Sequence, residues 1–223
     1  MNNPDLTLFA ERIHAALPQT QCTRCGYPDC AAYAEAIAQG AAAINQCPPG
    51  GAEGISRLAA IAGQPVLGLN PANGLEGPRS VAVIDETWCI GCTLCLPVCP
   101  TDAILGSNKM MHTVIEPHCT GCELCIAVCP VDCISLENVT GELTGWAAWS
   151  QAQAGEALDR YEFHSCLRPD SLGESHKTPL KSAKTSLEVT VKQSVIETAL
   201  AKSRAARNPL MANPPLPGDN NLK

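Results

Sequence analysis

The chain has 223 residues, a formal net charge of −7, 17 Gly and 18 Pro, but only two Phe, three Tyr and three Trp. Its length suits one or two domains, and so few aromatic side chains beside so many turn-forming residues argue against a large hydrophobic core. The acidic balance makes nucleic-acid binding a remote alternative, because affinity for a phosphate backbone requires clustered Lys and Arg.

Residues 1–62 are predicted to form helices around a group of cysteines. Apolar residues spaced near 3.6 predict a helix over 5–17. An Ala-rich segment predicts a second helix over 28–39, with Pro28 at its start and a glycine as its stop. A short helix is expected over 55–62, and the Gly- and Pro-rich segment 63–80 is expected to be a linker.

An internal repeat follows the linker, and it aligns residue 88 with residue 118. Residues 88–104 read WCIGCTLCLPVCPTDAI, and residues 118–134 read HCTGCELCIAVCPVDCI. Both contain C-x2-C-x2-C-x3-C-P, the ligand run of bacterial two-cluster ferredoxins. The duplication predicts pseudo-two-fold symmetry, with short strands at 82–85 and 134–137 at its ends and strands at 103–105 and 113–115 between them.

In such ferredoxins the fourth cysteine of each run ligates the other cluster. The expected ligands of cluster 2 are Cys89, Cys92, Cys95 and Cys129. The expected ligands of cluster 3 are Cys119, Cys122, Cys125 and Cys99. Zinc is the alternative, but a zinc site uses two C-x2-C pairs with a longer spacer and needs no third nearby cysteine.

A further four cysteines lie before the linker, at Cys22, Cys25, Cys30 and Cys47. Their spacing, C-x2-C-x4-C-x16-C, fits no common zinc pattern well. Three of them share one tight loop and the fourth returns after a helix, which is compatible with a third four-cysteine cluster. The spacing alone favours a cluster and leaves zinc or structural thiols open.

The motifs around these cysteines resemble those of a known family. L-P-Q-T-x-C-x-x-C-G-Y-P-x-C-x-x-Y-A begins at Leu17, and N-x-C-P-P-G-G begins at Asn45. Together with the doubled ferredoxin motif, they resemble RnfB, the multi-cluster ferredoxin subunit of Rnf-type electron transport complexes, over about residues 15–140. The resemblance implies that Cys22, Cys25, Cys30 and Cys47 also bind a [4Fe–4S] cluster, which makes three [4Fe–4S] clusters as cofactors.

The remaining residues are expected to have lesser roles. Cys133 aligns with Ala103 in the repeat, so a small buried thiol is expected there, and Cys166 is expected to be incidental. Trp88 and His118 each precede a first ligand, where packing is the simpler interpretation and tuning of the cluster is the alternative. The other histidines show no ligand spacing: His14, His112, His164 and His176.

The expected fold is α+β, in four parts. A small helical [4Fe–4S] domain over 1–62 is joined by the linker 63–80 to a two-[4Fe–4S] ferredoxin-like domain over 81–140. A partly helical, partly disordered tail over 141–223 follows, with helices over 146–163 and 188–207, a polar segment at 168–186 and a Pro-rich end.

The leading functional expectation is electron transfer through three clusters by a low-potential soluble ferredoxin. The alternative is a peripheral electron-carrying subunit of a membrane-bound Rnf-type ion-translocating complex. The resemblance favours the second interpretation, whereas the first is preferred because the family normally begins with a membrane helix and no stretch of 18 apolar residues occurs here.

No catalytic residues are predicted, because the sequence has no nucleotide-binding loop, flavin motif or substrate-pocket signature. Whether the chain acts as a carrier or as a subunit of an oxidoreductase stays open at this point. Segment 81–140 holds seven acidic residues and one basic residue, so the expected partners are redox proteins with basic docking faces, or Rnf-type membrane subunits. Without a secretory signal, a cytoplasmic location is expected, with the inner face of the cell membrane as the alternative.

Overall fold

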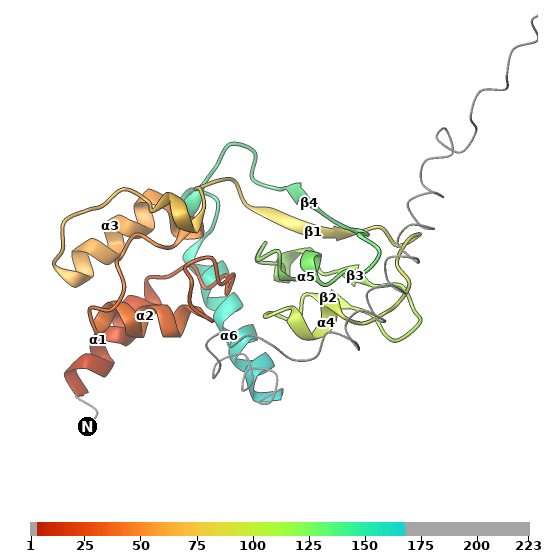
Figure 1. The fold of residues 1–223 in the computed structure, drawn as a ribbon, viewed down its shortest axis with the longest axis horizontal. Coiled ribbons are helices and arrows are strands. Elements are labelled where there is room, and N and C mark those ends of the chain that lie inside the picture. Colours follow the sequence, from red (N-terminus) through yellow and green to blue (C-terminus); the bar gives the residue numbers. More distant parts are fainter. Residues whose placement is uncertain (1–3, 168–223) are drawn as a thin grey trace, which may run out of the picture. The chain divides into compact units, whose positions relative to one another are not determined.

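The structure is a computed structural model that describes residues 4–167, all within one compact unit of the chain. The described residues form helices and two small antiparallel sheets, which confirms the predicted α+β class (Figure 1). The α-helices are α1 (Pro4–Ala15), α2 (Cys30–Ala38), α3 (Gly51–Ala62), α4 (Cys95–Val98), α5 (Leu124–Ala127) and α6 (Gln151–Leu167). The strands are β1 (Ser80–Ile84), β2 (Ile104–Leu105), β3 (Thr113–Val114) and β4 (Ile134–Asn138).

Four 3-10 turns complete these elements: η1 (Pro48–Gly50), η2 (Pro71–Asn73), η3 (Glu116–His118) and η4 (Gly145–Ala147). The helix predicted over 188–207, the polar segment 168–186 and the Pro-rich end lie outside the described residues. Within 4–167, none of the helices is long and apolar enough to cross a membrane.

Helices α1, α2 and α3 enclose the first hydrophobic core. Its largest fully buried side chains include Ile13, Leu17, Tyr33, Ile55 and Leu58. Burying each such side chain contributes about 1.5–3 kcal/mol relative to leaving it in water. This small core supports the loop that carries the first three cysteines and the turn that carries the fourth.

The helix ends have local causes. The Asp29 carboxylate accepts a hydrogen bond from the Ala32 amide, so Asp29 is the N-cap of α2 and the helix starts two residues later than predicted. Helix α3 starts at Gly51, four residues before the predicted start, because the Pro-containing turn η1 leads directly into it. It ends at Gly63, which takes the left-handed conformation of a typical C-cap with φ +64°.

The duplicated segment forms two matching two-stranded sheets. Strand β1 pairs with β4, with Ile84 opposite Ile134, and β2 pairs with β3, with Ile104 opposite Val114. In the alignment of the repeat, Ile84 corresponds to Val114 and Ile104 corresponds to Ile134, so the pairing follows the predicted pseudo-two-fold symmetry. The strands lie within a few residues of their predicted positions, although the inner pair is only two residues long.

The segment between α3 and β1 is fixed by hydrogen bonds rather than hanging free. The Asn73 side chain donates to the Arg24 carbonyl, and the Glu76 carboxylate accepts from the Ala52 amide and from the Thr144 hydroxyl. The Gly- and Pro-rich composition therefore predicts where the connection lies, but it does not show whether the connection is mobile. The domain limits set at residues 62, 80 and 140 stay a prediction.

Helix α6 and the turn before it lie between the N-terminal helices and the two sheets (Figure 1). Trp149 is buried and its indole N–H donates to the Pro18 carbonyl, 2.8 Å away. On α6 itself, Tyr161 donates to Asp29, whereas the buried His164 lies 2.8 Å from the Asp102 carboxylate. Helix α6 and the turn before it therefore contact both the N-terminal region, at Pro18 and Asp29, and the duplicated segment, at Asp102.

Candidate cluster-binding site

The structure brings Cys89, Cys92, Cys95 and Cys129 around one small cavity, here called cradle 2. Cys89 and Cys92 come from the loop that leads into α4, Cys95 is the first residue of α4, and Cys129 comes from the end of the second repeat. This is the crossed grouping expected from the motif.

A second small cavity is lined by Cys119, Cys122, Cys125 and Cys99, here called cradle 3. Cys119 and Cys122 come from the loop that leads into α5, Cys125 lies in α5, and Cys99 comes from the first repeat. The two halves of the duplicated segment therefore exchange their fourth cysteines. Among residues 4–167, no three His, Cys, Asp or Glu side chains converge as the ligands of a single ion would.

Backbone amides point at sulfur atoms of both cradles. The amides of Ala82 and His112, which are equivalent in the repeat, donate to Cys119 and Cys89 over 3.4 and 3.3 Å. The Ala103 and Cys133 amides likewise donate to Cys99 and Cys129, over 3.2 and 3.4 Å. Such N–H donors stabilise negative charge on sulfur, which a thiolate-ligated iron–sulfur cluster carries.

Gly91 and Gly121 occupy positions where a side chain would not fit. Both have left-handed backbones, with φ +66° and +69°. A Cβ at Gly91 would lie 2.5 Å from the Met110 amide nitrogen, and one at Gly121 would lie 2.3 Å from the Ser80 carbonyl oxygen. The glycines thus let each cradle loop pack closely against a neighbouring strand or turn.

The cysteines of the first tetrad, Cys22, Cys25, Cys30 and Cys47, also lie close together and form cradle 1. Burial raises the pKa of the Cys47 thiol well above its usual range, and the neighbouring thiols of Cys30, Cys22 and Cys25 act in the same direction. Burial also raises the pKa of Cys30 and of Cys25. These thiols would release protons on binding a cluster.

The segment that leads into the cradle 1 loop, and the start of that loop, have an unusual backbone. Gln19, Gln21 and Thr23 all have left-handed conformations, with φ +57°, +52° and +59°. The two glutamines are almost fully buried, and the Gln21 side-chain oxygen accepts from the Cys30 amide. Non-glycine residues persist in such conformations only when their surroundings fix them, and they are concentrated at functional sites.

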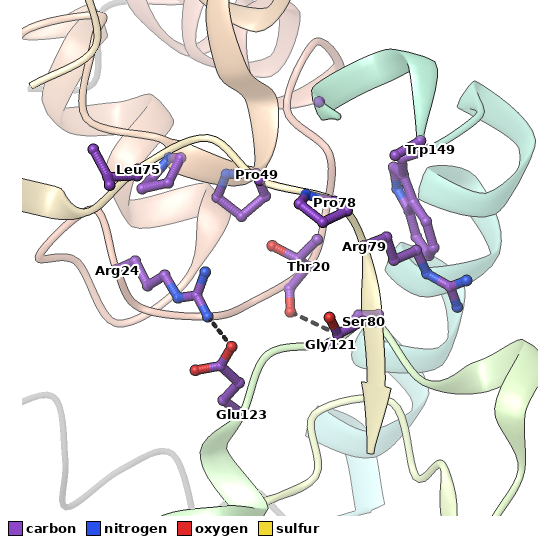
Figure 2. A pocket seen from close by; sticks show the side chains of 15 residues that line it. Thr20, Arg24, Pro49, Leu75, Pro78, Arg79, Ser80, Gly121, Glu123 and Trp149 are labelled. Carbon is purple, nitrogen blue, oxygen red and sulfur yellow. Dashed lines mark hydrogen bonds and ion pairs between the residues drawn. The ribbon is translucent and has the colours of Figure 1, made fainter. Parts of the chain in front are cut away.

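Residues close in sequence to the cysteines of cradles 1 and 3 line one cavity of about 100 Å³ (Figure 2). The Thr120 hydroxyl, next to Cys119, donates to the Thr20 carbonyl over 3.0 Å. An ion pair of 2.5 Å between Arg24 and Glu123 joins the two cysteine loops directly. The loop of cradle 3 is thereby attached to the loop of cradle 1.

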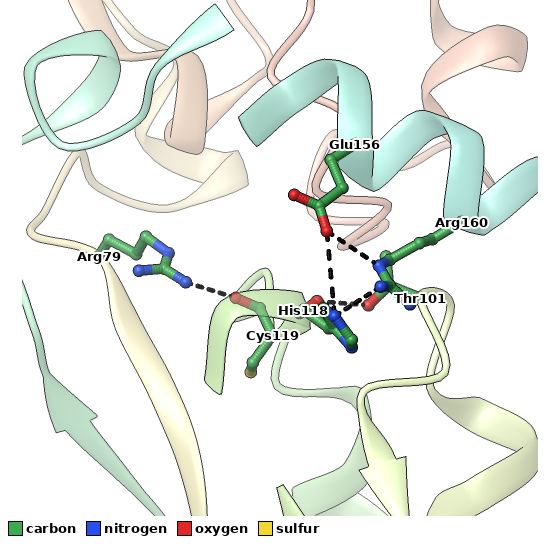
Figure 3. Close-up of polar contacts among 6 residues, drawn as sticks. All are labelled: Arg79, Thr101, His118, Cys119, Glu156 and Arg160. Carbon is green, nitrogen blue, oxygen red and sulfur yellow. Dashed lines mark hydrogen bonds and ion pairs between the residues drawn. The ribbon is translucent and has the colours of Figure 1, made fainter. Parts of the chain in front are cut away.

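Four polar contacts hold His118 and Cys119, at the start of the cradle 3 loop (Figure 3). The Arg79 guanidinium donates to the Cys119 carbonyl over 2.7 Å and packs against the Trp149 ring. Burial lowers the pKa of Arg79. His118 contacts Arg160 and Glu156 of α6, and its carbonyl accepts from the Thr101 hydroxyl.

Sequence reasoning missed one residue that belongs to this site. His112 shows no ligand spacing in the sequence, yet it is buried, and its Nδ1 atom lies 3.5 Å from the Cys89 sulfur and 3.7 Å from the Cys95 sulfur. Cys133 is buried, as expected, and its sulfur lies 3.5 Å from that of Cys129. Cys166 is exposed on α6.

The residues present fit iron–sulfur clusters. Each cradle offers four soft thiol donors, the ligand set that such clusters use. In cradles 2 and 3 the thiols surround a cavity and receive backbone N–H donors, and their spacing follows the known two-cluster run. Cradle 1 offers the same four thiol donors, although its cysteines are spaced differently in the sequence.

Two protein families match parts of the chain. Residues 82–136 match the family described as "4Fe-4S dicluster domain", and residues 17–49 match the family described as "Putative Fe-S cluster". The first match covers cradles 2 and 3 and the second covers cradle 1. Iron–sulfur cofactors are thus supported along both parts of the site. No solved structure matches the chain.

Curated relatives carry one common name, the B subunit of an ion-translocating oxidoreductase complex. The chain is 59% identical over 109 residues to the protein of that name from Azoarcus sp., a match that covers 49% of this chain and 60% of the relative. The Thiobacillus denitrificans protein is 59% identical over 107 residues, or 48% and 57% of the two chains. The Vibrio cholerae protein is 52% identical over 109 residues, or 48% and 54%. The matched parts span less than two thirds of each relative.

Proposed function

We propose that this chain, which resembles the B subunit of ion-translocating oxidoreductase complexes over about half of its length, carries electrons within such a complex through three [4Fe–4S] clusters. The observation that carries the proposal is that three four-thiol cradles lie within one compact unit, with cradle 1 attached to cradle 3 by the Arg24–Glu123 and Thr120–Thr20 contacts.

The ligands we propose are the twelve cysteines of the three cradles in the crossed grouping. Cluster 1 is held by Cys22, Cys25, Cys30 and Cys47, cluster 2 by Cys89, Cys92, Cys95 and Cys129, and cluster 3 by Cys119, Cys122, Cys125 and Cys99. When bound, each cluster supplies a site that accepts and returns one electron. The protein itself positions the thiolates, donates N–H groups to them and excludes water.

The packing supports the electron path cluster 1 – cluster 3 – cluster 2. Cradle 3 contacts cradle 1 on one side and shares the ferredoxin-like core with cradle 2 on the other. Rates of electron transfer fall steeply with distance, so an electron that passes between clusters 1 and 2 would travel through cluster 3.

Cradle 2 offers the surface for exchange with a partner. Four large apolar side chains beside it are between 49% and 59% exposed: Ile90, Leu94, Met110 and Met111. At the position equivalent to Ile90, cradle 3 has Thr120, which is buried. Exposed apolar groups that gather at one site mark contact surfaces more often than single ones do. A basic face on the partner would complement the acidic 81–140 segment.

A free soluble ferredoxin, the leading expectation from the sequence, is the less well supported interpretation. The relatives from Azoarcus sp., Thiobacillus denitrificans and Vibrio cholerae are all named as a subunit of an ion-translocating complex. The chain's own acidic character continues to argue against nucleic-acid binding.

The first test is an anaerobic affinity purification from the native host, with and without detergent, followed by mass spectrometry of co-purifying proteins. The proposal predicts integral membrane redox subunits, recovered in smaller amounts with Ile90→Glu and Met111→Glu. Leu8→Glu is the matched control, because Leu8 is 59% exposed on α1. Recovery of soluble oxidoreductases alone would favour the free ferredoxin.

The number of clusters is tested on the purified protein by iron and sulfide analysis. Three [4Fe–4S] clusters correspond to about 12 irons per chain, and two correspond to about eight. Cys47→Ser should lower the iron content by about one third. An unchanged iron content in that variant would contradict cluster binding at cradle 1 and leave the two-cluster segment as the sole carrier.

A further inference from the structure

Among the positions that touch the sulfurs and differ between the two halves of the repeat, one carries an imidazole on one side. Residues 82 and 112 are equivalent in the repeat, and both donate their backbone N–H to the first cysteine of a cradle. At cradle 3 this residue is alanine. At cradle 2 it is His112, and its imidazole lies against the sulfurs of Cys89 and Cys95. The duplicated backbone is thus kept while a polar ring is added on one side only.

A socket in the fold holds the imidazole in place. His112 is only 1% exposed. Gly106 lies against the edge of the ring, and a Cβ built at Gly106 would come within 1.7 Å of the His112 Cδ2 atom. The ring cannot keep this position next to any larger residue at 106. The arrangement therefore depends on two residues, the histidine and the glycine.

The surroundings of the ring decide which nitrogen carries the proton. Nδ1 faces two sulfurs, which accept hydrogen bonds when they ligate iron, whereas Nε2 is buried without a hydrogen-bond partner among the described residues. A lone pair on Nδ1 would face the negative sulfurs, and an N–H on Nε2 would be a buried donor with no acceptor. The neutral ring with its proton on Nδ1 avoids both costs.

We propose that His112 donates N–H···S hydrogen bonds from Nδ1 to Cys89 and Cys95 and thereby raises the reduction potential of cluster 2. This inference rests on the proposed function, because it requires a cluster in cradle 2. Reduction adds negative charge to the cluster and its sulfurs, and a hydrogen-bond donor stabilises the more negative state more strongly. The equivalent Ala82 offers cradle 3 no imidazole, and the side chain that cradle 3 has beside a sulfur is the Thr101 hydroxyl, 4.0 Å from Cys99.

Cradle 3 has a charged neighbour of its own. The proposal therefore predicts a change in the reduction potential of cluster 2, and not which of clusters 2 and 3 has the higher potential. Arg79 donates to the carbonyl of Cys119 rather than to a sulfur. Its positive charge lies near cluster 3 and acts on that cluster. The tests below therefore compare each variant with the unmodified protein.

The experiment is an anaerobic redox titration of the complete protein, monitored by EPR, for three forms: unmodified, His112→Leu and His112→Asn. Leucine fills a similar volume without a donor, whereas the asparagine amide can place an N–H near the position of Nδ1. We expect His112→Leu to lower the equilibrium constant for reduction of one cluster by about tenfold. This is equivalent to a decrease of ~59 mV in reduction potential for a one-electron couple. His112→Asn should recover most of this shift.

A second variant tests the same hydrogen bond without removing the histidine. Gly106→Ala should displace the imidazole and lower the same potential in the same direction. His118→Leu is the matched control, because His118 directly precedes Cys119 of cradle 3 and its ring contacts Arg160 and Glu156. That control should leave the cluster-2 signal at its original potential.

The outcomes separate the two proposals. A potential that stays unchanged in His112→Leu and Gly106→Ala, with the iron content intact, overturns the role of His112 and leaves the proposed function standing. Equal shifts in the leucine and asparagine variants overturn the hydrogen bond in favour of packing. If Cys89→Ser leaves the iron content and the EPR signals unchanged, cradle 2 holds no cluster, and the proposed function fails first.

Discussion

Cradles 2 and 3 arise from one repeated sequence, yet the protein surrounds them differently. Cradle 3 is enclosed by the cradle 1 loop, by Arg79 and by α6, whereas cradle 2 has exposed apolar neighbours and a buried imidazole. The repeat supplies the same thiols and the same backbone donors to both. The comparison shows that the repeated cysteines set the position of each cradle. The residues around the cysteines, which differ between the two halves, set what each cradle contacts.

The largest effect is expected from breaking the exchange of ligands between the halves. Cys129→Ser should remove or convert cluster 2, with loss of about one third of the iron, because its sulfur lines cradle 2. EPR after anaerobic reduction would identify the lost cluster. Cys166→Ser is the control, since that thiol is exposed and distant from the cradles in sequence. Loss of cluster 3 in place of cluster 2 would contradict the crossed grouping.

The next effect concerns the packing that encloses cradle 3. Trp149 is buried, donates to the Pro18 carbonyl and lies over Arg79, so Trp149→Ala should lower the free energy of unfolding by about 3 kcal/mol. Anaerobic denaturant unfolding measures this change. Trp88 is 37% exposed beside cradle 2, and Trp88→Ala should cost less than about 1 kcal/mol. Equal losses would mean that both cradles depend equally on their surroundings.

A smaller effect is expected in the cluster-free protein as the pH rises. Burial raises the pKa of Cys125 to about 12 and that of the equivalent Cys95 to about 11, from 9.0. The unfolded chain ionises first, so stability is fully present below pH 9 and is lost as the pH rises through these values.

Denaturant unfolding between pH 8 and 12 with reductant present would measure that slope. Cys125→Ala should flatten the slope over a wider pH range than Cys95→Ala, because the pKa of Cys125 is raised further. In the cluster-loaded protein the ligands are already thiolates, so the slope should be absent. An equal effect of the two variants would show that burial does not distinguish the cradles.

The smallest effect is expected at the ion pair between the loops of cradles 1 and 3. Arg24 and Glu123 are 34% and 42% exposed in their side chains, so a double-mutant cycle with Arg24→Ala and Glu123→Ala should give only about 0.5 kcal/mol of coupling. The coupling should shrink at high salt. A coupling above about 2 kcal/mol would mean that this pair, rather than Trp149, holds the two cradles together.

Much of the duplicated segment can be predicted because its signals are local. The cysteine spacing and the alignment of the two repeats predict the short strands and their pseudo-two-fold symmetry, and the tight turns at Gly91 and Gly121 follow from the same motif. Helix limits are less accurate where a single residue decides them, as Asp29 does for α2.

Other features cannot be read from the sequence, because they depend on contacts between distant residues. Nothing near His112 in the sequence indicates that its ring meets Cys89, 23 residues earlier, or that Gly106 leaves space for it. The pattern of α6 likewise predicts a helix but not its neighbours, since Tyr161 meets Asp29 across 132 residues. The spacing of the first tetrad leaves zinc open, and the family match rather than periodicity favours a cluster there.

The exchange of Cys99 and Cys129 has a consequence for biosynthesis. Cradle 1 has all of its thiols once residue 47 has left the ribosome, and its supporting core is complete once α3 follows, while the rest of the chain is still being made. Cradle 2 begins at Cys89 but lacks its fourth thiol until residue 129 is available, and cradle 3 waits for the same segment. Under the proposed grouping, a nascent chain that stalls between these points would expose three-thiol loops to oxidation, and both halves would have to be complete before either cluster could be bound.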